Sequence, residues 1–269
     1  MLTERLYKKI TSIDDRRNIA IPGNAEDTLT YCAEHFIEIA KVAIDSKGTF
    51  YVALSGGSTP RALYQLLASP SYNKQINWNK VQIFWSDERS VPPGNTESNY
   101  HMAMEAGLKS LPIPKENIHR MNAESQNIEA AALEYEKLIE KIVPKSQFDF
   151  VMLGMGEDGH TASLFPRTHG LHVQNRLIIA NFIPEKNTWR MSFTYKLIND
   201  ASHITIYVIG KSKASMLKQV LNGHYIPDDL PIQRVGTSAH KALWIVDSDA
   251  ASDLIINNTN NIRDIPTSS

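Results

Sequence analysis

The stretch that decides the fold is residues 49–68, TFYVALSGGSTPRALYQLLA, in which an apolar run leads through two glycines into a helical pattern. The run at 49–54 is largely apolar without alternation, which is typical of a strand buried on both faces of a sheet. Residues 61–68 have helical character, and we expect Thr59 to cap that helix with Pro60 at its first position. The segment is therefore predicted to be a strand, a tight turn and a helix.

The same unit recurs along the chain. Apolar runs predict further strands at residues 81–85, 148–153, 204–209 and 242–246. Amphipathic patterns predict helices at 24–43, capped by Asn24 with Asp27, from about residue 98, and at 128–142, 211–221 and 249–255. Buried strands that alternate with helices indicate an α/β fold, Rossmann-like, with a mainly parallel sheet covered by helices on both faces. Residues 177–194 break this rhythm with two strand-like runs, which predicts a small antiparallel insertion.

The composition is that of an average globular protein. Of its 269 residues 42% are hydrophobic and 21% charged, and 28 basic against 29 acidic side chains leave no surplus of positive charge for nucleic acid. No apolar run approaches the ~18 residues of a membrane span, and the charged first twenty residues contain no secretory signal. The single cysteine, Cys32, fits a reducing compartment and is expected to be buried in a helix. We expect one cytoplasmic domain over residues 1–269, with a polar tail at 257–269.

The turn after the first buried strand is a candidate phosphate cradle. Gly56 and Gly57 let the backbone approach a ligand closely, and Ser58 and Thr59 add hydroxyl donors at the positive end of a helix. The lysine of a Walker motif is absent. An ordinary strand-to-helix turn is the alternative interpretation.

The segment 154–160, GMGEDGH, carries the candidate base. Its glycine spacing matches the dinucleotide fingerprint, but Glu157 and Asp158 would place two carboxylates beside a pyrophosphate, which disfavours a nicotinamide cofactor. We expect His160 to begin a helix, whose positive end favours a neutral imidazole, and Asp158 to orient the ring and stabilise its cation. These two effects on the imidazole oppose each other, and the sequence leaves their balance open. A histidine that merely caps a helix is the alternative.

Candidate anion ligands follow other strands. Arg89 ends the second strand as part of a Ser-Asp-Glu-Arg segment, and its alternative role is a local ion pair with Asp87 or Glu88. Arg190 and Lys213 are further candidates, although a lysine in the first turn of a helix is commonly solvated. Because ligands bind at the carboxyl ends of strands in such sheets, we expect these loops to meet in one crevice.

Nucleophile and metal motifs are missing. Pro60 stands where the last glycine of a nucleophile elbow belongs, and no His-Glu-x-x-His segment occurs. His169 and His172 lie in a polar segment without supporting cysteines, and we interpret them as surface residues rather than metal ligands.

Taken together, the loops resemble the signature of the 6-phosphogluconolactonase family. The resemblance rests on an ordered set of segments that spans nearly the whole chain: SGGSTP at 55–60, DER at 87–89 with VP at 91–92 and SNY at 98–100, LGMGEDGHTASLFP at 153–166, RMSFT at 190–194, GKSKA at 210–214 and WIVD at 244–247. It implies a Rossmann-like fold shared with glucosamine-6-phosphate deaminase and ribose-5-phosphate isomerase.

The resemblance also implies an activity and residue roles. The activity is hydrolysis of 6-phospho-D-glucono-1,5-lactone to 6-phosphogluconate in the pentose phosphate pathway, with no metal and no organic cofactor. His160 would be the general base, and Arg89 and Lys213 would hold the phosphate with the Gly56–Thr59 turn. Asp87 is a further candidate at the substrate, and Arg190 occupies a motif position whose role stays open.

Two alternatives remain at this stage. A deaminase of the same fold is expected to carry a glutamate that helps ring opening, where this chain has Phe165, and phenylalanine cannot relay a proton. A non-catalytic sugar-phosphate sensor is expected to carry a DNA-binding module, for which the stretch before Asn24 is short and the net charge of −1 unsuited. Both features favour the lactonase, with a small sugar-phosphate lactone as its partner.

Overall fold

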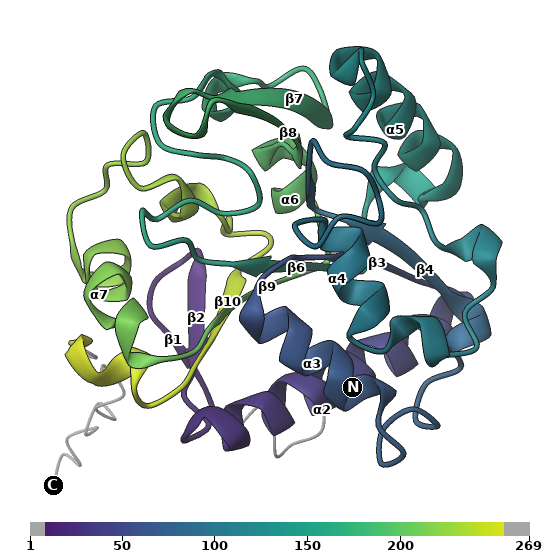
Figure 1. Cartoon of the computed structure of the whole chain (residues 1–269). Helices are drawn as coiled ribbons and strands as arrows, with labels where there is room; N and C mark the ends of the chain where they lie inside the picture. Colours follow the sequence, from purple (N-terminus) through teal and green to yellow (C-terminus); the bar gives the residue numbers. More distant parts are fainter. Residues whose placement is uncertain (1–8, 256–269) are drawn as a thin grey trace, which may run out of the picture.

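The computed structural model describes residues 9–255, and its centre is a seven-stranded sheet (Figure 1). The strand order is β1-β2-β10-β9-β6-β3-β4, and every neighbouring pair is parallel except β1 and β2. The strands are β1 (Ile10–Ser12), β2 (Arg17–Ala20), β3 (Phe50–Leu54), β4 (Val81–Trp85), β6 (Phe150–Gly154), β9 (His203–Val208) and β10 (Ala242–Val246). The mainly parallel sheet is thus confirmed.

A second, antiparallel sheet has the order β5-β8-β7. Strands β7 (Ile178–Ile183) and β8 (Thr188–Phe193) form the hairpin predicted as an insertion. Strand β5 (Asp87–Arg89) corrects the expectation that these residues end the second strand, because they form a separate strand whose backbone pairs with β8. This pairing joins segments about a hundred residues apart, which local sequence patterns do not report.

Helices cover both faces of the large sheet. They are α2 (Ala25–Lys47), α3 (Ser58–Ala68), α4 (Asn99–Glu105), α5 (Ile128–Ile142), α6 (Tyr195–Asn199) and α7 (Ala214–Asn222). Side chains of α2, α3 and α4 share one apolar core, and those of α5, α6 and α7 share the other. Consecutive residues of β6 enter the two cores in turn, with Met152 in the first and Leu153 in the second. Both faces are therefore apolar, as the continuous strands predicted.

Short 3₁₀ turns connect these elements. They are Trp78–Lys80, Leu108–Ser110, Lys115–Asn117, Pro144–Ser146, His169–His172, Pro184–Lys186, Lys211–Lys213, Pro231–Arg234 and Ala250–Asp253. The last of these stands where a final helix over 249–255 was expected, and the predicted tail at 257–269 lies outside the described residues. None of the helices within residues 9–255 combines the length and the apolarity needed to cross a membrane.

The helix boundaries follow local chemistry. Asn24 caps α2 as predicted, since its side-chain oxygen accepts a hydrogen bond from the Asp27 N–H at 3.0 Å. Cys32 is fully buried on this helix. The predicted cap of α3 is wrong, because the helix begins at Ser58 and Gly57 occupies the capping position with φ +109°. Thr59 therefore lies inside the first turn.

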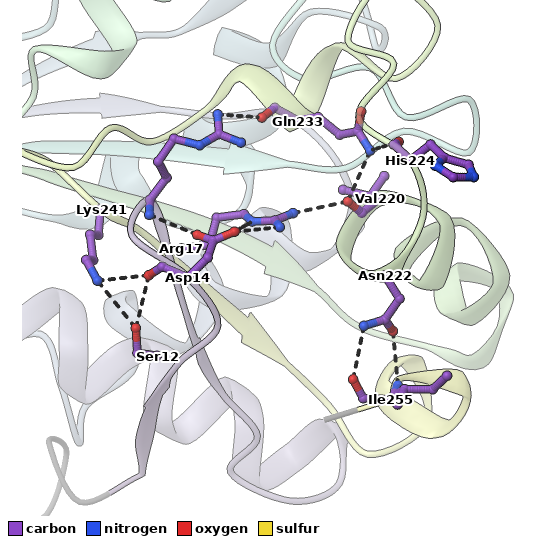
Figure 2. Close-up of polar contacts among 10 residues, drawn as sticks. Ser12, Asp14, Arg17, Val220, Asn222, His224, Gln233, Lys241 and Ile255 are labelled. Carbon is purple, nitrogen blue, oxygen red and sulfur yellow. Dashed lines mark hydrogen bonds and ion pairs between the residues drawn. The ribbon is translucent and has the colours of Figure 1, made fainter. Parts of the chain in front are cut away.

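The N-terminal hairpin β1–β2, which the sequence analysis missed, is attached to α7 by polar contacts (Figure 2). The Asp14 carboxylate accepts a hydrogen bond from Nε of Arg17 at 2.7 Å, and Nη1 of Arg17 donates to the Val220 carbonyl at 3.1 Å. Asn222 exchanges two hydrogen bonds with the backbone of Ile255, each 3.0 Å long. These contacts fix both ends of the described chain against the same helix.

Candidate active site

A pocket of about 310 Å³ lies at the carboxyl ends of the parallel strands. Its position follows from the topology, because the chain leaves β3 for β4 on one side and later adds β6 on the other. The loops after β3 and β6 flank this switch point, where open α/β sheets bind their ligands. The sequence-predicted residues that line the pocket are Gly56, Gly57, Ser58, Thr59, Asp87, Arg89, His160, Arg190 and Lys213. Asp158 does not line it but contacts His160.

The turn after β3 presents backbone to the pocket. Gly57 has φ +109°, a conformation that other residues adopt only with strain. A Cβ atom on Gly56 would lie 1.9 Å from Oδ1 of Asn99, so this position also requires glycine. Helix α3 begins directly after this turn, and the first N–H groups of a helix have no partner within it. The turn can therefore accept an anion such as phosphate.

His160 forms a pair with Asp158 beside this turn. The imidazole Nδ1 lies 2.5 Å from Oδ1 of Asp158, and the same oxygen accepts a hydrogen bond from the His160 backbone N–H at 3.1 Å. Burial raises the pKa of Asp158, but its interactions with His160, the side-chain hydrogen bond first among them, outweigh burial and hold that pKa below its ordinary value. An ionised carboxylate can only accept a hydrogen bond, so the proton of the neutral ring lies on Nδ1. Nε2 is then the nitrogen that can take a proton.

The expectation that His160 begins a helix is wrong. Residues 155–168, which all lie in the described part of the chain, contain no helix. Ala162 and Arg167 have φ values of +48° and +57°, and Leu164 donates a backbone hydrogen bond to Thr161 at 2.9 Å, so the chain turns back on itself. The carboxylate of Asp158, rather than a helix terminus, therefore determines which imidazole nitrogen is protonated.

Phe165 and Lys186 also line the pocket. The sequence set Phe165 only in the place of a deaminase glutamate, and Lys186 was not among the predicted site residues. The Phe165 ring stacks on the His160 ring with centroids 4.0 Å apart and planes 19° apart. Nζ of Lys186, at the tip of the β7–β8 hairpin, lies 5.6 Å from the centroid of the Phe165 ring. Lys186 could have been predicted as a site residue, because it is a cation at the turn of the predicted insertion. No sequence pattern predicts that Phe165 stacks on His160.

Two arginines enter the pocket from the small sheet. Arg89 and Arg190 are directly opposite each other on β5 and β8. Burial and the charge of Arg89 lower the pKa of Arg190. Nη1 of Arg89 donates to the carbonyl of Glu97, and within residues 9–255 neither Asp87 nor Glu88 forms an ion pair with it. The local ion pair considered for Arg89 is thus not formed in the structure.

Lys213 follows β9 and reaches the pocket from the side of β6 opposite the turn after β3. It ends the 3₁₀ turn Lys211–Lys213, which follows Gly210 with φ +103°. The buried carboxylate of Asp247 accepts hydrogen bonds from the N–H groups of Gly210, at 3.0 Å, and Ala250, at 2.9 Å. Asp247 thereby fixes the turn that carries the lysine.

Two acidic side chains organise the edge of the pocket at β5. Oδ2 of Asp87 accepts a hydrogen bond from the Ser163 hydroxyl at 2.7 Å, which ties β5 to the His160 loop. Glu88 is buried and accepts hydrogen bonds from Ser98 Oγ at 2.9 Å and from the backbone N–H of Asn99 at 2.8 Å. Burial raises the pKa of Glu88 despite these bonds. From the sequence, Glu88 was only a possible partner of an arginine, and this role was not predicted.

The remaining histidine candidates lie elsewhere. His169 and His172 are exposed on a 3₁₀ turn and do not line the pocket. Among the described residues, no three His, Cys, Asp or Glu side chains are grouped so that they could hold a metal ion.

The fold and the pocket define a Rossmann-like α/β protein in which a histidine paired with a carboxylate lines a pocket together with a glycine turn and several cations. The sequence profile of the family described as glucosamine-6-phosphate isomerases/6-phosphogluconolactonase matches residues 23–244. The chain therefore belongs to this family, and the resemblance found in the sequence is confirmed.

Individual proteins agree with this placement. A protein of Chlamydia trachomatis named 6-phosphogluconolactonase is 37% identical over 243 residues, which cover 90% of this chain and 92% of that one. The solved 6-phosphogluconolactonase from Trypanosoma cruzi superposes with a TM-score of 0.78 at 26% identity, covering 92% of this chain and 99% of that chain. A monomeric glucosamine-6-phosphate deaminase, at 18% identity and a TM-score of 0.73, covers 87% of this chain and 99% of its own, and shares the fold.

Proposed function

We propose that this chain is a 6-phosphogluconolactonase, which opens 6-phospho-D-glucono-1,5-lactone with water to give 6-phospho-D-gluconate. The observation that carries the proposal is His160, which is paired with Asp158 at 2.5 Å and lines the same pocket as a phosphate-accepting glycine turn and several cations. Family membership and the names of the relatives support the same reaction.

In the proposed mechanism, His160 acts as general base through Nε2. It takes a proton from water while the water oxygen bonds to the lactone carbonyl carbon, which leaves a tetrahedral oxyanion. The bond from that carbon to the ring oxygen then breaks, and the imidazolium returns its proton to the leaving oxygen. Asp158 stabilises the transient cation. A positioned histidine base accounts for about 10²- to 10⁴-fold of the rate.

The phosphate supplies binding energy away from the reacting carbon. We assign its binding to Arg89, Lys213 and the Gly56–Thr59 turn, all of which line the pocket. Binding at this remote group orients the lactone ring for attack, which lowers the entropic cost of the reaction. Arg190 lies opposite Arg89, and we assign it to the same anion, because a phosphate dianion offsets the repulsion between two neighbouring guanidinium groups.

Deamination of a sugar phosphate is the second candidate, because a deaminase shares the fold. The content of the pocket disfavours it. Phe165, which stands where a deaminase is expected to carry its ring-opening glutamate, is buried against His160 and has no proton to transfer.

The test is to generate the lactone in situ from glucose 6-phosphate in a buffer where spontaneous opening is slow. Its disappearance is followed with and without the protein, while ammonia release from glucosamine 6-phosphate is measured in parallel. The proposal expects rapid lactone loss and no ammonia. Ammonia release would move the chain to the deaminase branch, and a sugar phosphate that binds without turnover would support a sensor.

A further inference from the structure

The Phe165 ring lies flat against the His160 ring, and both side chains line the pocket. The imidazole is held at its edge by Asp158 and on its face by the phenyl ring, whose centroid is 4.0 Å away. We propose that Phe165 is a positioning residue, which orients the His160 base for attack on the lactone. This inference rests on the proposed function, because it specifies how the base in that reaction is aimed.

The two contacts restrict different motions of the imidazole. A hydrogen bond to Nδ1 fixes the distance of one atom but leaves the ring able to swing about that contact. A ring stacked within 19° of parallel blocks this rotation, because tilting the imidazole would drive it into the phenyl carbons. The direction of Nε2 is thereby fixed, and a misplacement of about 1 Å at a reacting group costs on the order of 10²-fold in rate.

Phe165 can restrain His160 only if the phenyl ring is itself held in place. It is 5% exposed, and the tight turn that contains Ala162 brings it back over the residue five positions earlier. Its carbonyl oxygen accepts two hydrogen bonds from Thr168, one from the hydroxyl at 2.8 Å and one from the backbone N–H at 3.3 Å. The ring thus stands on a closed, hydrogen-bonded turn.

That turn is joined to the antiparallel sheet. The buried Asn181 on β7 donates through Nδ2 to the Thr168 hydroxyl at 3.0 Å and to the carbonyl of Ser163 at 2.9 Å. The same hairpin places Lys186 over the Phe165 ring. The insertion therefore supports the catalytic loop from outside the large sheet, and Phe165 transmits that support to the base.

The test compares three variants with the wild-type protein. Phe165→Leu keeps an apolar side chain but removes the flat ring, and we expect kcat to fall about 10- to 100-fold with KM nearly unchanged. Phe165→Tyr keeps the ring and should retain most of the wild-type kcat. Phe148→Leu is the matched control, because Phe148 is a buried phenylalanine that lies outside the pocket, and it should leave kcat unchanged. Equal kcat in Phe165→Leu and Phe148→Leu would overturn the inference.

A second measurement separates positioning from general loosening of the fold. In His160→Ala, added imidazole should restore part of the protein-dependent activity by entering the space beside Phe165. The double variant His160→Ala/Phe165→Leu should lose most of that rescue, whereas undiminished rescue would contradict the stack as the aligning element.

The inference and the proposed function fail in distinguishable ways. If the wild-type protein opens the lactone while Phe165→Leu keeps its kcat, only the inference fails. If the wild-type protein does not open the lactone, the proposed function fails. The stack is then still tested by NMR, since Phe165→Leu must remove the ring-current shift of the His160 ring protons.

Discussion

Replacing Asp158 by asparagine tests how the base is activated. The carboxylate contacts Nδ1 of His160 at 2.5 Å and is 39% exposed. A hydrogen bond to a charged group contributes about 1.5–3 kcal/mol, and solvent screening at this exposure places the value at the lower end, about 1.5–2 kcal/mol. In the proposed mechanism this charge stabilises the imidazolium that forms as His160 takes the proton, so the loss is expected in kcat. Each 1.36 kcal/mol is tenfold in rate, which gives a decrease of about 10- to 30-fold.

The assay for Asp158→Asn is steady-state lactone hydrolysis, corrected for spontaneous opening. KM should stay within about 2-fold of the wild-type value, because Asp158 does not line the pocket and removing a transition-state contact lowers kcat alone. Glu157→Gln is the matched control, since Glu157 is the exposed acidic neighbour without a contact to the imidazole, and it should behave like the wild-type protein. An Asp158→Asn enzyme with an unchanged kcat would refute the role of the carboxylate.

Three further predictions follow from the same geometry. Arg89→Ala should raise KM about 10- to 100-fold with a smaller effect on kcat, as expected for a lost charge-assisted contact to phosphate, and an unchanged KM would make Arg89 structural. Gly57→Ala should cost about 1–2 kcal/mol of unfolding free energy, measured by denaturant titration, because φ of +109° strains any residue with a Cβ while 3.8 Å to the nearest atom leaves room for it. Burial raises the pKa of Asp14, but hydrogen bonds from Arg17 and Arg16 lower it below its ordinary value. The resulting stabilisation is present above the unfolded pKa of about 3.9 and is lost as pH falls through the folded pKa. Asp14→Asn should therefore have a lower free energy of unfolding than the wild-type protein at pH 7 and an equal one in strong acid. Asp15→Asn, at an exposed site, should leave the free energy of unfolding unchanged at both pH values.

The fold could be predicted where patterns are local. The continuous apolar runs located β3, β4, β6, β9 and β10 of the parallel sheet, and the pair Asn24 and Asp27 marked the start of α2 because a helix cap is made by residues three apart. Strand β5 and the β1–β2 hairpin escaped, since three- and four-residue strands exist only through pairing with distant segments. Short strands of this kind leave no periodicity of their own.

In the candidate site, too, the local features could be predicted from the sequence and the three-dimensional contacts could not. The residue types at the ends of the strands were readable, and the topology brings them to one pocket. The helix expected at His160 was wrong, because positive φ at Ala162 reverses the chain, and that conformation is uncommon for alanine. The stack of Phe165 on His160 is a consequence of this reversal. A prediction from helical spacing would have placed the two side chains apart.

The most direct test of the central claim is the kcat of His160→Ala on 6-phosphogluconolactone, measured beside the wild-type protein and the uncatalysed blank. The account predicts efficient opening by the wild-type protein and a decrease of about 10²-fold or more in the variant, with KM little changed, because a general base acts in the transition state. A His160→Ala protein that opens the lactone at the wild-type rate would contradict the claim that His160 is the base.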